Sequence, residues 1–508
     1  MTPTYNADEA ASGLVITEGL PAPDARGKID PADVVRWATS VYTPAVDQNG
    51  NTVLLDEKSR RAVPLADASK TLSAALWDAA DVVLSDETFK AAMRTVRSFA
   101  DRNRCETALR VARRGARVWL DLGDTIVSVQ PDGWSLESTP DPARPYFLPA
   151  PGGRTIPRPS RNGSRADLAK VLGLPPDSTQ FRACWGWLVG AAALPDAPRP
   201  ILWVTGAPGS AKTLRTLMVT SVIAPAESLG AFPDALSKDL DVAASQEYLL
   251  TFDDVPMNAV GEKVSKWLTR LVTGTTIKYR VLYSDNAVNT LHLKRAAAVT
   301  SIDLPAGIAA DNIERTSLVH FSKVQGRTEA EVRAEFETLH PAILGALLDD
   351  VAATLAADIP RPGSLHRLGD FHLSMLALEQ MTGQPYASEF ITGGEDAQTA
   401  MAMEEPIVLA VFEFMAERTG RTWVGTNDEL LSELSRVRIQ HGIGSGDSRW
   451  PQTSTSLSRA LNMRENVLRL LGIDTTRSAL RHMPGTARKA QRLRSITMVQ
   501  ESEVPNAA

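Results

Sequence analysis

Apolar and polar residues follow a helical period near the start of the chain and then change to an alternating one. Residues Ala32–Thr39 and Leu72–Val83 carry apolar side chains at helical spacing, which predicts two amphipathic helices. From Ala116 to Trp134 apolar and polar residues alternate around glycine-containing turns, as in short antiparallel strands. Together the patterns predict a small α+β domain over residues 31–137, in which the sequence carries no catalytic signature.

Two breaks in the pattern divide the rest of the chain. Seven prolines fall between Pro140 and Pro159; such a stretch does not pack as regular structure, which predicts a linker. A second break falls at Thr392–Gln398. We therefore expect a loosely ordered tail (1–30), the N-terminal domain (31–137), the linker (138–165), an α/β core (166–357), a helical connector (358–403) and a mainly helical C-terminal domain (404–500).

A glycine-rich loop follows the pattern of a buried strand and precedes a helix. The apolar run Ile201–Thr205 is typical of a parallel sheet. The residues after it are Gly206, Ala207, Pro208, Gly209, Ser210, Ala211, Lys212 and Thr213. Strand, loop and helix in this order predict a P-loop, in which backbone amides and the helix dipole surround phosphate oxygens. The alternative is a chance glycine–lysine turn.

Two residues of this loop are assigned specific roles, and one departs from the consensus. Lys212 is expected to reach the β- and γ-phosphates, and the Thr213 hydroxyl to ligate Mg²⁺. Ala211 stands where the consensus GxxxxGK[ST] has glycine. A methyl group is tolerable there if φ is negative, but it could narrow the space for phosphate.

Two adjacent acids end the next strand-like segment. The run Glu247–Phe252 leads into Asp253 and Asp254, and the carboxyl ends of parallel strands lie at one edge of a sheet. We expect Asp253 to hold Mg²⁺, directly or through water, and Asp254 to polarise the attacking water. The alternative interpretation is that both acids are solvated turn residues.

Two further polar positions follow downstream. The run Ala296–Val299 ends in Thr300-Ser301, where a polar side chain could lie between the loop and the acids and sense the γ-phosphate. A strand that simply ends in a turn is the alternative. Arg315 precedes another strand-like run; its guanidinium could act across a subunit boundary on the transferring phosphoryl group. It could instead form a surface ion pair with Asp311 or Glu314.

A basic hairpin is predicted between the two acids and the Thr300 run. Residues Thr275–Tyr283 alternate, with Lys278 and Arg280 on one side, and Ala287–Leu293 completes the hairpin. In a ring ATPase such a hairpin can face the central channel and hold a phosphate backbone. A hairpin whose solvated face is merely basic is the alternative.

These landmarks resemble, in this order, the superfamily three helicases and the helicase half of viral and phage primase-helicases. They are more similar to a family of bacterial phage and mobile-element ATP-binding proteins. The matching stretches run from about Arg110 almost to the C-terminus and include GAPGSAKT, LLTFDDV, TGTTIKYRVLYSD, AVTSID, DNIERT and HRLGDF. The resemblance implies an AAA+-like P-loop core, a homo-hexamer and ATP-driven movement on DNA, with Arg315 as the finger arginine. Thr300-Ser301 departs from this pattern, because asparagine is usual there.

The C-terminal segment combines predicted helices with a basic end. Residues Pro406–Met415 favour a helix, Thr426–Glu429 a cap, and Leu457–Leu471 a further helix. Between Leu457 and Ile496 nine Lys and Arg stand against two acids, which suits contact with phosphate. The order resembles a winged-helix module, with DNA contacts expected from Arg459, Arg464, Arg488 and Lys489. A solvated helical face with a disordered tail is the alternative.

Composition limits the remaining possibilities. The net charge of −6 and pI near 5.8 argue against a chain that coats nucleic acid along its whole length, although a local basic patch is allowed. Cys105 and Cys184 are far apart, which predicts reduced thiols. The sequence has no run of 18 apolar residues and no signal-peptide pattern at its N-terminus. We therefore expect a cytoplasmic protein without a membrane partner.

The sequence therefore predicts an ATP-dependent DNA helicase or translocase of phage or mobile-element replication. Its expected cofactors are ATP and Mg²⁺, and its expected partner is single-stranded or forked DNA. The alternative is an ATP-gated DNA-binding protein, a replication initiator or mobile-element regulator, that hydrolyses weakly and does not unwind. A kinase of small metabolites is a third possibility, but it has no obvious use for the second carboxylate, the hairpin or the finger arginine.

Overall fold

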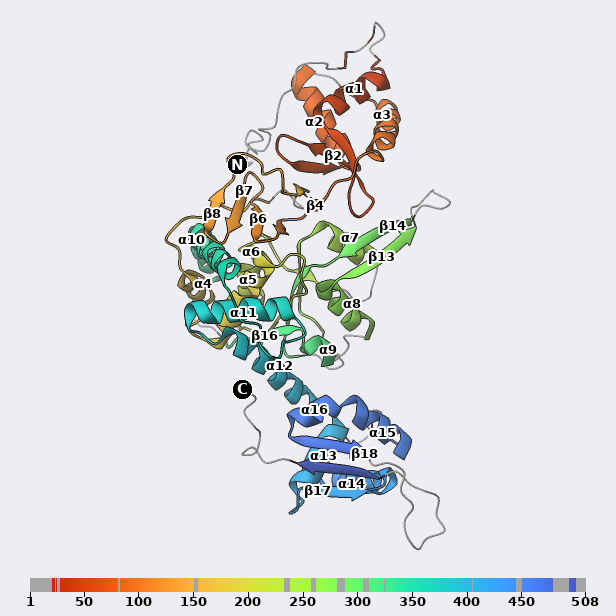
Figure 1. The fold of residues 1–508 in the computed structure, drawn as a ribbon, viewed down its shortest axis with the longest axis vertical. Coiled ribbons are helices and arrows are strands. Elements are labelled where there is room, and N and C mark those ends of the chain that lie inside the picture. The colour runs from red at the N-terminus through yellow and green to blue at the C-terminus, as the bar shows by residue number, and fades with distance from the viewer. Residues whose placement is uncertain are drawn as a thin grey trace. The chain divides into compact units, whose positions relative to one another are not determined.

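The computed structural model describes most of the chain. It describes residues 21–22, 24, 28–80, 83–149, 154–232, 238–256, 262–280, 288–304, 310–323, 326–403, 405–444, 450–477 and 493–498. The chain divides into two compact units, residues 1–390 (unit 1) and 391–508 (unit 2). Each unit mixes helices with β-sheet, so the fold is mixed α/β (Figure 1).

Unit 1 begins with a five-stranded sheet of order β1-β2-β3-β9-β4. Helix α1 starts at Pro31 because the Asp30 side chain caps it by accepting from Ala32 N. Val34 and Trp37 of α1 pack with Leu72 of α2 in one hydrophobic cluster. The elements are α1 (Pro31–Val41), β1 (Thr43–Val46), β2 (Thr52–Asp56), β3 (Arg61–Pro64), α2 (Ala68–Ala80), α3 (Asp86–Ala100), β4 (Thr107–Ala108) and β9 (Tyr146–Phe147).

The alternating segment of the sequence forms a second sheet, an antiparallel meander of four strands. Its strands are β5 (Val111–Arg114), β6 (Arg117–Asp121), β7 (Ile126–Gln130) and β8 (Gly133–Leu136). The strands predicted over 116–134 are therefore confirmed. Val118, Leu120 and Val129 belong to the same hydrophobic core as the long helix α10 (Glu329–Ala356). This sheet thus packs on the helices that surround the central sheet.

The proline-rich stretch 138–165 packs more closely than a linker does. It contains β9, which pairs in parallel with β3 and β4, and Phe147 is fully buried. Further along, Ser160 N donates to Pro341 O at 2.8 Å. A Cβ on Gly345 of α10 would lie 1.9 Å from Ser160 O, so the two backbones touch. The prediction that this stretch holds no regular structure is wrong. Tyr146 and Phe147 lie between two prolines but keep their own backbone N–H groups, so they can still pair with the neighbouring strands.

The centre of unit 1 is a five-stranded parallel sheet of order β11-β12-β15-β10-β16. Its strands β10 and β15 are buried along their whole length. Because all five strands run in one direction, their carboxyl ends share one edge of the sheet. The strands are β10 (Ile201–Thr205), β11 (Gly230–Ala231), β12 (Leu249–Asp253), β15 (Ala296–Ser301) and β16 (Thr316–His320).

Helices enclose this sheet, and α10 joins several of them. Its buried Asp350 accepts hydrogen bonds from Arg165 Nε and Trp185 Nε1, both at 2.6 Å. The remaining elements of unit 1 are α4 (Arg165–Leu172), α5 (Thr179–Ala193), α6 (Lys212–Ser221), α7 (Lys238–Gln246), α8 (Glu262–Thr273), β13 (Thr275–Arg280), β14 (Val288–Leu293), α9 (Ala310–Ile313) and α11 (Gly369–Thr382). Among the described helices, α10 is long and apolar enough to cross a membrane, and 56% of its apolar window is buried inside the structure.

Helix α12 (Tyr386–Met403) runs through the position where the sequence predicts a break. Gly393 and Gly394 each weaken a helix by about 1 kcal/mol relative to alanine. Once a helix has started, however, each further residue adds a hydrogen bond, so an 18-residue helix tolerates both. A break in the helix at Thr392–Gln398 is therefore wrong, whereas the division of the chain into its two units does fall close by, between residues 390 and 391.

Unit 2 combines helices with a three-stranded antiparallel sheet of order β17-β19-β18. The predicted cap is confirmed: Thr426 Oγ1 accepts from Glu429 N, and Glu429 Oε2 accepts from Thr426 N. The helix predicted over Leu457–Leu471 is divided at Arg464, the residue that ends α15 and precedes α16. The elements are α13 (Pro406–Ala416), β17 (Thr422–Gly425), α14 (Asn427–Gln440), α15 (Ser454–Met463), α16 (Glu465–Leu470), β18 (Ile473–Arg477) and β19 (Arg494–Met498).

Replacing Gly345 by alanine should lower the free energy of unfolding by about 3 kcal/mol, because the new methyl group would overlap Ser160 O. Gly394→Ala is the matched control in another helix. Its added Cβ meets nothing within 4 Å, so stability should rise by up to about 1 kcal/mol. Denaturant unfolding of both variants measures the difference, and equal effects would contradict a close contact between α10 and the 160–163 turn.

Candidate functional site

The loop after β10 is fixed at its start by neighbouring strands. Gly206 N donates to Ile302 O, just beyond β15, at 3.1 Å. A Cβ on Gly206 would lie 2.6 Å from Phe321 O and 2.5 Å from Ser210 Oγ, so only glycine fits without a rearrangement. The loop therefore leaves the sheet between β15 and β16, at the edge where the parallel strands end.

Two residues of the loop adopt a left-handed backbone. Gly209 has φ +83° and Ala211 has φ +54°. The φ of Ala211 is therefore positive, and not the negative value that would make alanine tolerable at this position. Ala211 is the N-cap of α6 in the left-handed conformation, which costs a non-glycine residue about 1–2 kcal/mol. The loop is thus strained at the position where it departs from the consensus.

Three segments meet at one carboxylate oxygen. Asp253 Oδ1, at the end of β12, accepts hydrogen bonds from Thr213 Oγ1 at 2.9 Å and from Thr300 Oγ1. Thr213 lies in the first turn of α6, directly after the loop, and Thr300 lies in β15. The structure therefore brings together the hydroxyl, the acid and the strand-end threonine that the sequence singles out.

The order of the strands explains this meeting. Strand β15 lies between β10 and β12, so Thr300 stands between the loop and the acids. Thr300 Oγ1 also accepts from Asp254 N at 3.0 Å, and Thr300 O accepts from Val255 N at 2.8 Å. These bonds hold Asp254 at φ +52°, with its side chain exposed at the same edge of the sheet.

Several polar groups at this edge have no partner among the described residues. The half-buried Lys212 forms no hydrogen bond or ion pair with them, and Ser210 Oγ is fully buried without a partner. A cation at a helix N-terminus suits a phosphate, and a carboxylate beside a hydroxyl suits Mg²⁺, which takes oxygen ligands. The residues present therefore fit a nucleotide phosphate with its metal ion.

Sequence reasoning missed the contacts that anchor these strand ends. Trp203 Nε1 donates to Ser301 Oγ at 2.7 Å, and Ser301 Oγ donates to Asp303 O at 2.6 Å. On α6 the buried Arg215 lies 4.7 Å from the Phe321 ring centre, and burial lowers the pKa of its guanidinium. The sequence signal for such anchors is a polar residue inside an apolar run.

Arg315 lies at the opposite edge of the sheet. It precedes β16, and its carbonyl oxygen accepts from Ile201 N, at the amino end of β10, at 2.8 Å. The five residues of β10 separate this edge from the loop, which corresponds to about 16 Å along the strand. The structure thus does not bring Arg315 to the loop of its own chain.

The predicted hairpin forms, with β13 and β14 paired from Thr275↔Leu293 to Arg280↔Val288. Lys278 and Arg280 lie in β13, but their side chains are outside the described part. The two basic residues after β14 are bonded internally: Lys294 Nζ donates to Asp196 O, and Arg295 Nε to Ala244 O. Burial lowers the pKa of Arg295 to about 10, so it stays protonated at neutral pH.

The basic residues predicted to contact DNA in unit 2 have different environments. Arg459 is exposed on α15. Arg464 forms an ion pair with Glu405 that ties the end of α15 to the start of α13. Arg488 and Lys489 lie outside the described residues.

Two protein-family models match the chain. The actinomycete integrative conjugative element replication protein model matches residues 177–396, which include the loop, Asp253, Thr300 and Arg315. The model of the C-terminal domain of the same replication protein, RepA, matches residues 407–506. No curated protein matches the chain.

Solved structures give a weak likeness. An apo structure of the C-terminal region of NrS-1 (its A form) is 12% identical, with a TM-score of 0.43, over 93% of this chain and 100% of that one. A second apo structure of that region (residues 305–718) is 12% identical, with a TM-score of 0.40, over 93% of this chain and 99% of that one. Values this low do not establish a shared fold.

Ala211→Gly should raise the free energy of unfolding by about 1 kcal/mol, because it removes the strain of the left-handed backbone. Ala207→Gly, in the same loop but without a positive φ, should lower it by about 0.5–1 kcal/mol through the greater freedom of the unfolded chain. Thermal unfolding measures both variants. A loss of stability in both would contradict the left-handed conformation at Ala211.

Proposed function

We propose, from the match to the two family models of actinomycete integrative conjugative element replication proteins, that this chain is a replication protein of that kind and acts as an ATP-driven DNA motor. Unit 1 would be a P-loop ATPase with an AAA+-like core, and unit 2 a winged-helix-like DNA-binding domain. The chain would act in the cytoplasm, in replication of the element, as a helicase or translocase on single-stranded or forked DNA.

The observation that carries this proposal is the shared oxygen of Asp253. Thr213, from the glycine-rich loop, and Thr300, from the intervening strand, both donate to it. An acid that is only a solvated turn residue is not expected to accept hydrogen bonds from two hydroxyl groups of separate elements. The strand inserted between β10 and β12 also suits a P-loop ATPase in which a third polar side chain lies beside the phosphates.

Each residue of the site would then have its own role in binding or hydrolysing ATP. The backbone amides of residues 206–213 and the Lys212 ammonium would bind the β- and γ-phosphates of ATP. Thr213 and Asp253 would hold Mg²⁺, which neutralises charge on the phosphate oxygens when bound. Asp254, exposed beside them, would orient and deprotonate the attacking water, while Thr300 holds the backbone of Asp254 in place.

Arg315 would act on a neighbouring subunit, because it lies at the far edge of its own sheet. A guanidinium is always charged and can stabilise the transferring phosphoryl group. Catalysis of this kind requires self-association, and we propose a homo-hexamer in which each site is completed by its neighbour. The hairpin with Lys278 and Arg280 would then face the DNA.

Unit 2 supports the DNA-binding half of the proposal by its topology. Its elements α13, β17, α14, α15, α16, β18 and β19, with a three-stranded antiparallel sheet, resemble those of a winged-helix module. Helix α15 would take the place of the recognition helix. The sequence between Leu457 and Ile496 carries seven more basic than acidic residues, which suits a phosphate backbone.

One observation favours a second candidate, an ATP-gated DNA-binding protein that hydrolyses slowly. The left-handed Ala211 places a methyl group in the loop where the consensus has glycine. If that methyl group restricts the phosphates, ATP would bind but turn over slowly. Displacement of a labelled strand from forked DNA separates the candidates, because only the motor unwinds.

Lys212→Ala should lower the affinity for Mg-ATP at least 100-fold and abolish hydrolysis, because the Lys212 ammonium is the cation of the loop and has no partner among the residues that the structure describes. Lys90→Ala, on the exposed face of α3, is the matched control and should change neither. Isothermal titration calorimetry and a phosphate-release assay provide the measurements. Unchanged ATP affinity in the Lys212 variant would rule out the proposed site.

Mixing two inactive variants tests whether Arg315 acts between subunits. Arg315→Ala should lose at least 100-fold in kcat with little change in ATP affinity, and Lys212→Ala should lose binding. Mixed assemblies contain interfaces with an intact Lys212 on one side and an intact Arg315 on the other, so ATPase activity should partly return. If mixing restores nothing in assemblies shown to exchange subunits, Arg315 is not a finger residue.

A further inference from the structure

Unit 2 contains a pocket on the exposed face of α15. Its volume is about 590 Å³, and its lining includes Asn427, Ser454, Thr455, Arg459, Asn462 and Arg494. Residues 454, 455, 458, 459 and 462 recur at helical spacing, so they lie along one face of α15. Seven of the nine lining residues carry an amide, a hydroxyl or a guanidinium, and the other two, Met463 and Leu493, are apolar. The pocket therefore combines polar groups with apolar surface, as a base edge requires.

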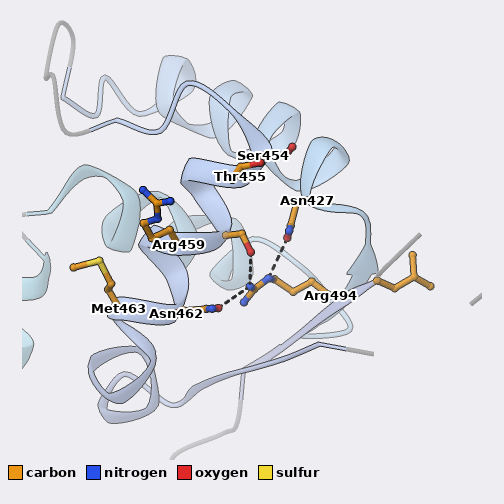
Figure 2. Close-up of a pocket in the computed structure, with 9 residues that line it drawn as sticks. Asn427, Ser454, Thr455, Arg459, Asn462, Met463 and Arg494 are labelled. Carbon is orange, nitrogen blue, oxygen red and sulfur yellow. Dashed lines mark hydrogen bonds between the residues drawn. The ribbon is translucent and has the colours of Figure 1, made fainter. Parts of the chain in front are cut away.

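Arg494 lies at the base of this pocket. It is the first residue of β19, the central strand of the sheet, and its side chain is only 2% exposed. Arg494 Nε donates to Asn427 Oδ1 at 3.1 Å and Arg494 Nη2 donates to Asn462 Oδ1 at 3.0 Å and to Ser458 Oγ at 3.4 Å. Figure 2 shows the guanidinium between the two asparagines, with Arg459 further along the helix.

These bonds fix the orientation of both amides. A guanidinium has donors and no acceptor, so each asparagine must turn its oxygen toward Arg494. The NH₂ groups of Asn427 and Asn462 then face away from Arg494, and neither has a partner among the described residues. The pocket therefore offers amide donors, hydroxyl groups and the cation of Arg459, and it selects a ligand rich in acceptors.

Asn462 would ordinarily read adenine, because an asparagine amide can accept from N6 and donate to N7 together. Here Asn462 Oδ1 already accepts from Arg494, so only the NH₂ group of Asn462 is left to contact a base, as a donor. Guanine presents two acceptors, O6 and N7, in the major groove. Beside Asn462, Met463 is 77% exposed and supplies an apolar surface of the kind that contacts a thymine methyl group.

We propose that this pocket reads guanine-containing base edges in the major groove of duplex DNA, and that Arg494 is a positioning residue that sets the reading. The inference deepens the proposed DNA-binding function and rests on it. Helix α15 has ten residues, and an α-helix with its side chains is about 10–12 Å across, so a major groove about 12 Å wide admits it. The donors of Asn462 and Asn427 contact the bases, while Arg459 contacts the backbone.

The test uses the full chain and a substitution that keeps the contact with Arg494. Asn462→Asp retains an oxygen for the guanidinium and adds an ion pair, but it removes the NH₂ donor. The folded state should therefore be at least as stable, whereas the base reading is lost. Gln440→Glu, the same change of amide to acid at the far end of α14, is the control for added charge. Asn427→Asp is a second, independent variant.

The wild-type chain first selects from a pool of duplexes with a randomised centre, at one fixed salt concentration because affinity depends on salt. We expect at least one position to enrich guanine, and replacing that guanine by adenine should weaken binding about tenfold. In Asn462→Asp the selected duplex should bind at least tenfold more weakly, and the guanine-to-adenine ratio should fall below about twofold. Gln440→Glu should keep the ratio.

Each outcome decides a different question. If the wild-type chain has DNA-stimulated ATPase activity but enriches no duplex sequence, the proposal of a base-reading pocket is wrong and the proposed motor function is unaffected. The same conclusion follows if Asn462→Asp and Asn427→Asp keep the wild-type sequence preference. If the wild-type chain binds no DNA and its ATPase does not respond to DNA, the proposed function itself fails. Asn462→Asp losing affinity equally for every sequence would overturn the assignment to base edges.

Discussion

The hydrogen bonds at Asp253 Oδ1 are the interaction on which the candidate site depends. Through that one oxygen, β12 is joined to the first turn of α6 and to β15. The three elements carry side chains far apart in sequence, and parallel strands place their ends at one edge. Without the inserted strand β15, the acid-bearing turn would have no neighbour to hold it against the loop. The chemistry proposed for the site therefore follows from the order of the strands.

Strain surrounds this oxygen on both sides. Ala211 in the loop and Asp254 beside Asp253 have φ +54° and +52°. A left-handed backbone costs alanine about 1–2 kcal/mol, and aspartate adopts it more readily than most other non-glycine residues. Such conformations persist where buried surroundings impose them, and they occur often at functional sites. Here the buried strands β10 and β15 and the bonds of Thr300 supply that constraint. The site is shaped by the sheet more than by the preferences of its own residues.

Local patterns predict much of this architecture from the sequence. The apolar run at 201–205, the glycines after it and the acids at the end of β12 are short-range signals, and the structure has the corresponding strands, loop and turn. The alternating strands near Trp119 and the cap at Thr426 are equally local. The expected grouping of Thr213, Asp253 and Thr300 needed only the additional assumption of a parallel sheet.

Prediction from the sequence fails where the local structure depends on residues that are distant along the chain. The pairing of β9 with β3 and β4 cannot be read from a proline-rich stretch, and the continuation of α12 through two glycines depends on the helix on each side. The φ of Ala211 is decided by closure of the loop onto α6, and the anchoring of Trp203 on Ser301 by the neighbouring strand. The orientation of the Asn462 amide likewise depends on Arg494, 32 residues further along the chain.

The hydroxyl of Thr300 carries a single proton, and in this structure that proton is committed to Asp253. An asparagine at the same place would bring two, and could keep the acid while reaching a second acceptor. Threonine can donate to only one acceptor at a time. A group that takes the Asp253 oxygen away from Thr300 frees the hydroxyl to donate to another acceptor. The hydrogen bond that Thr300 makes from β15 therefore depends on whether the Asp253 carboxylate is bound to something else.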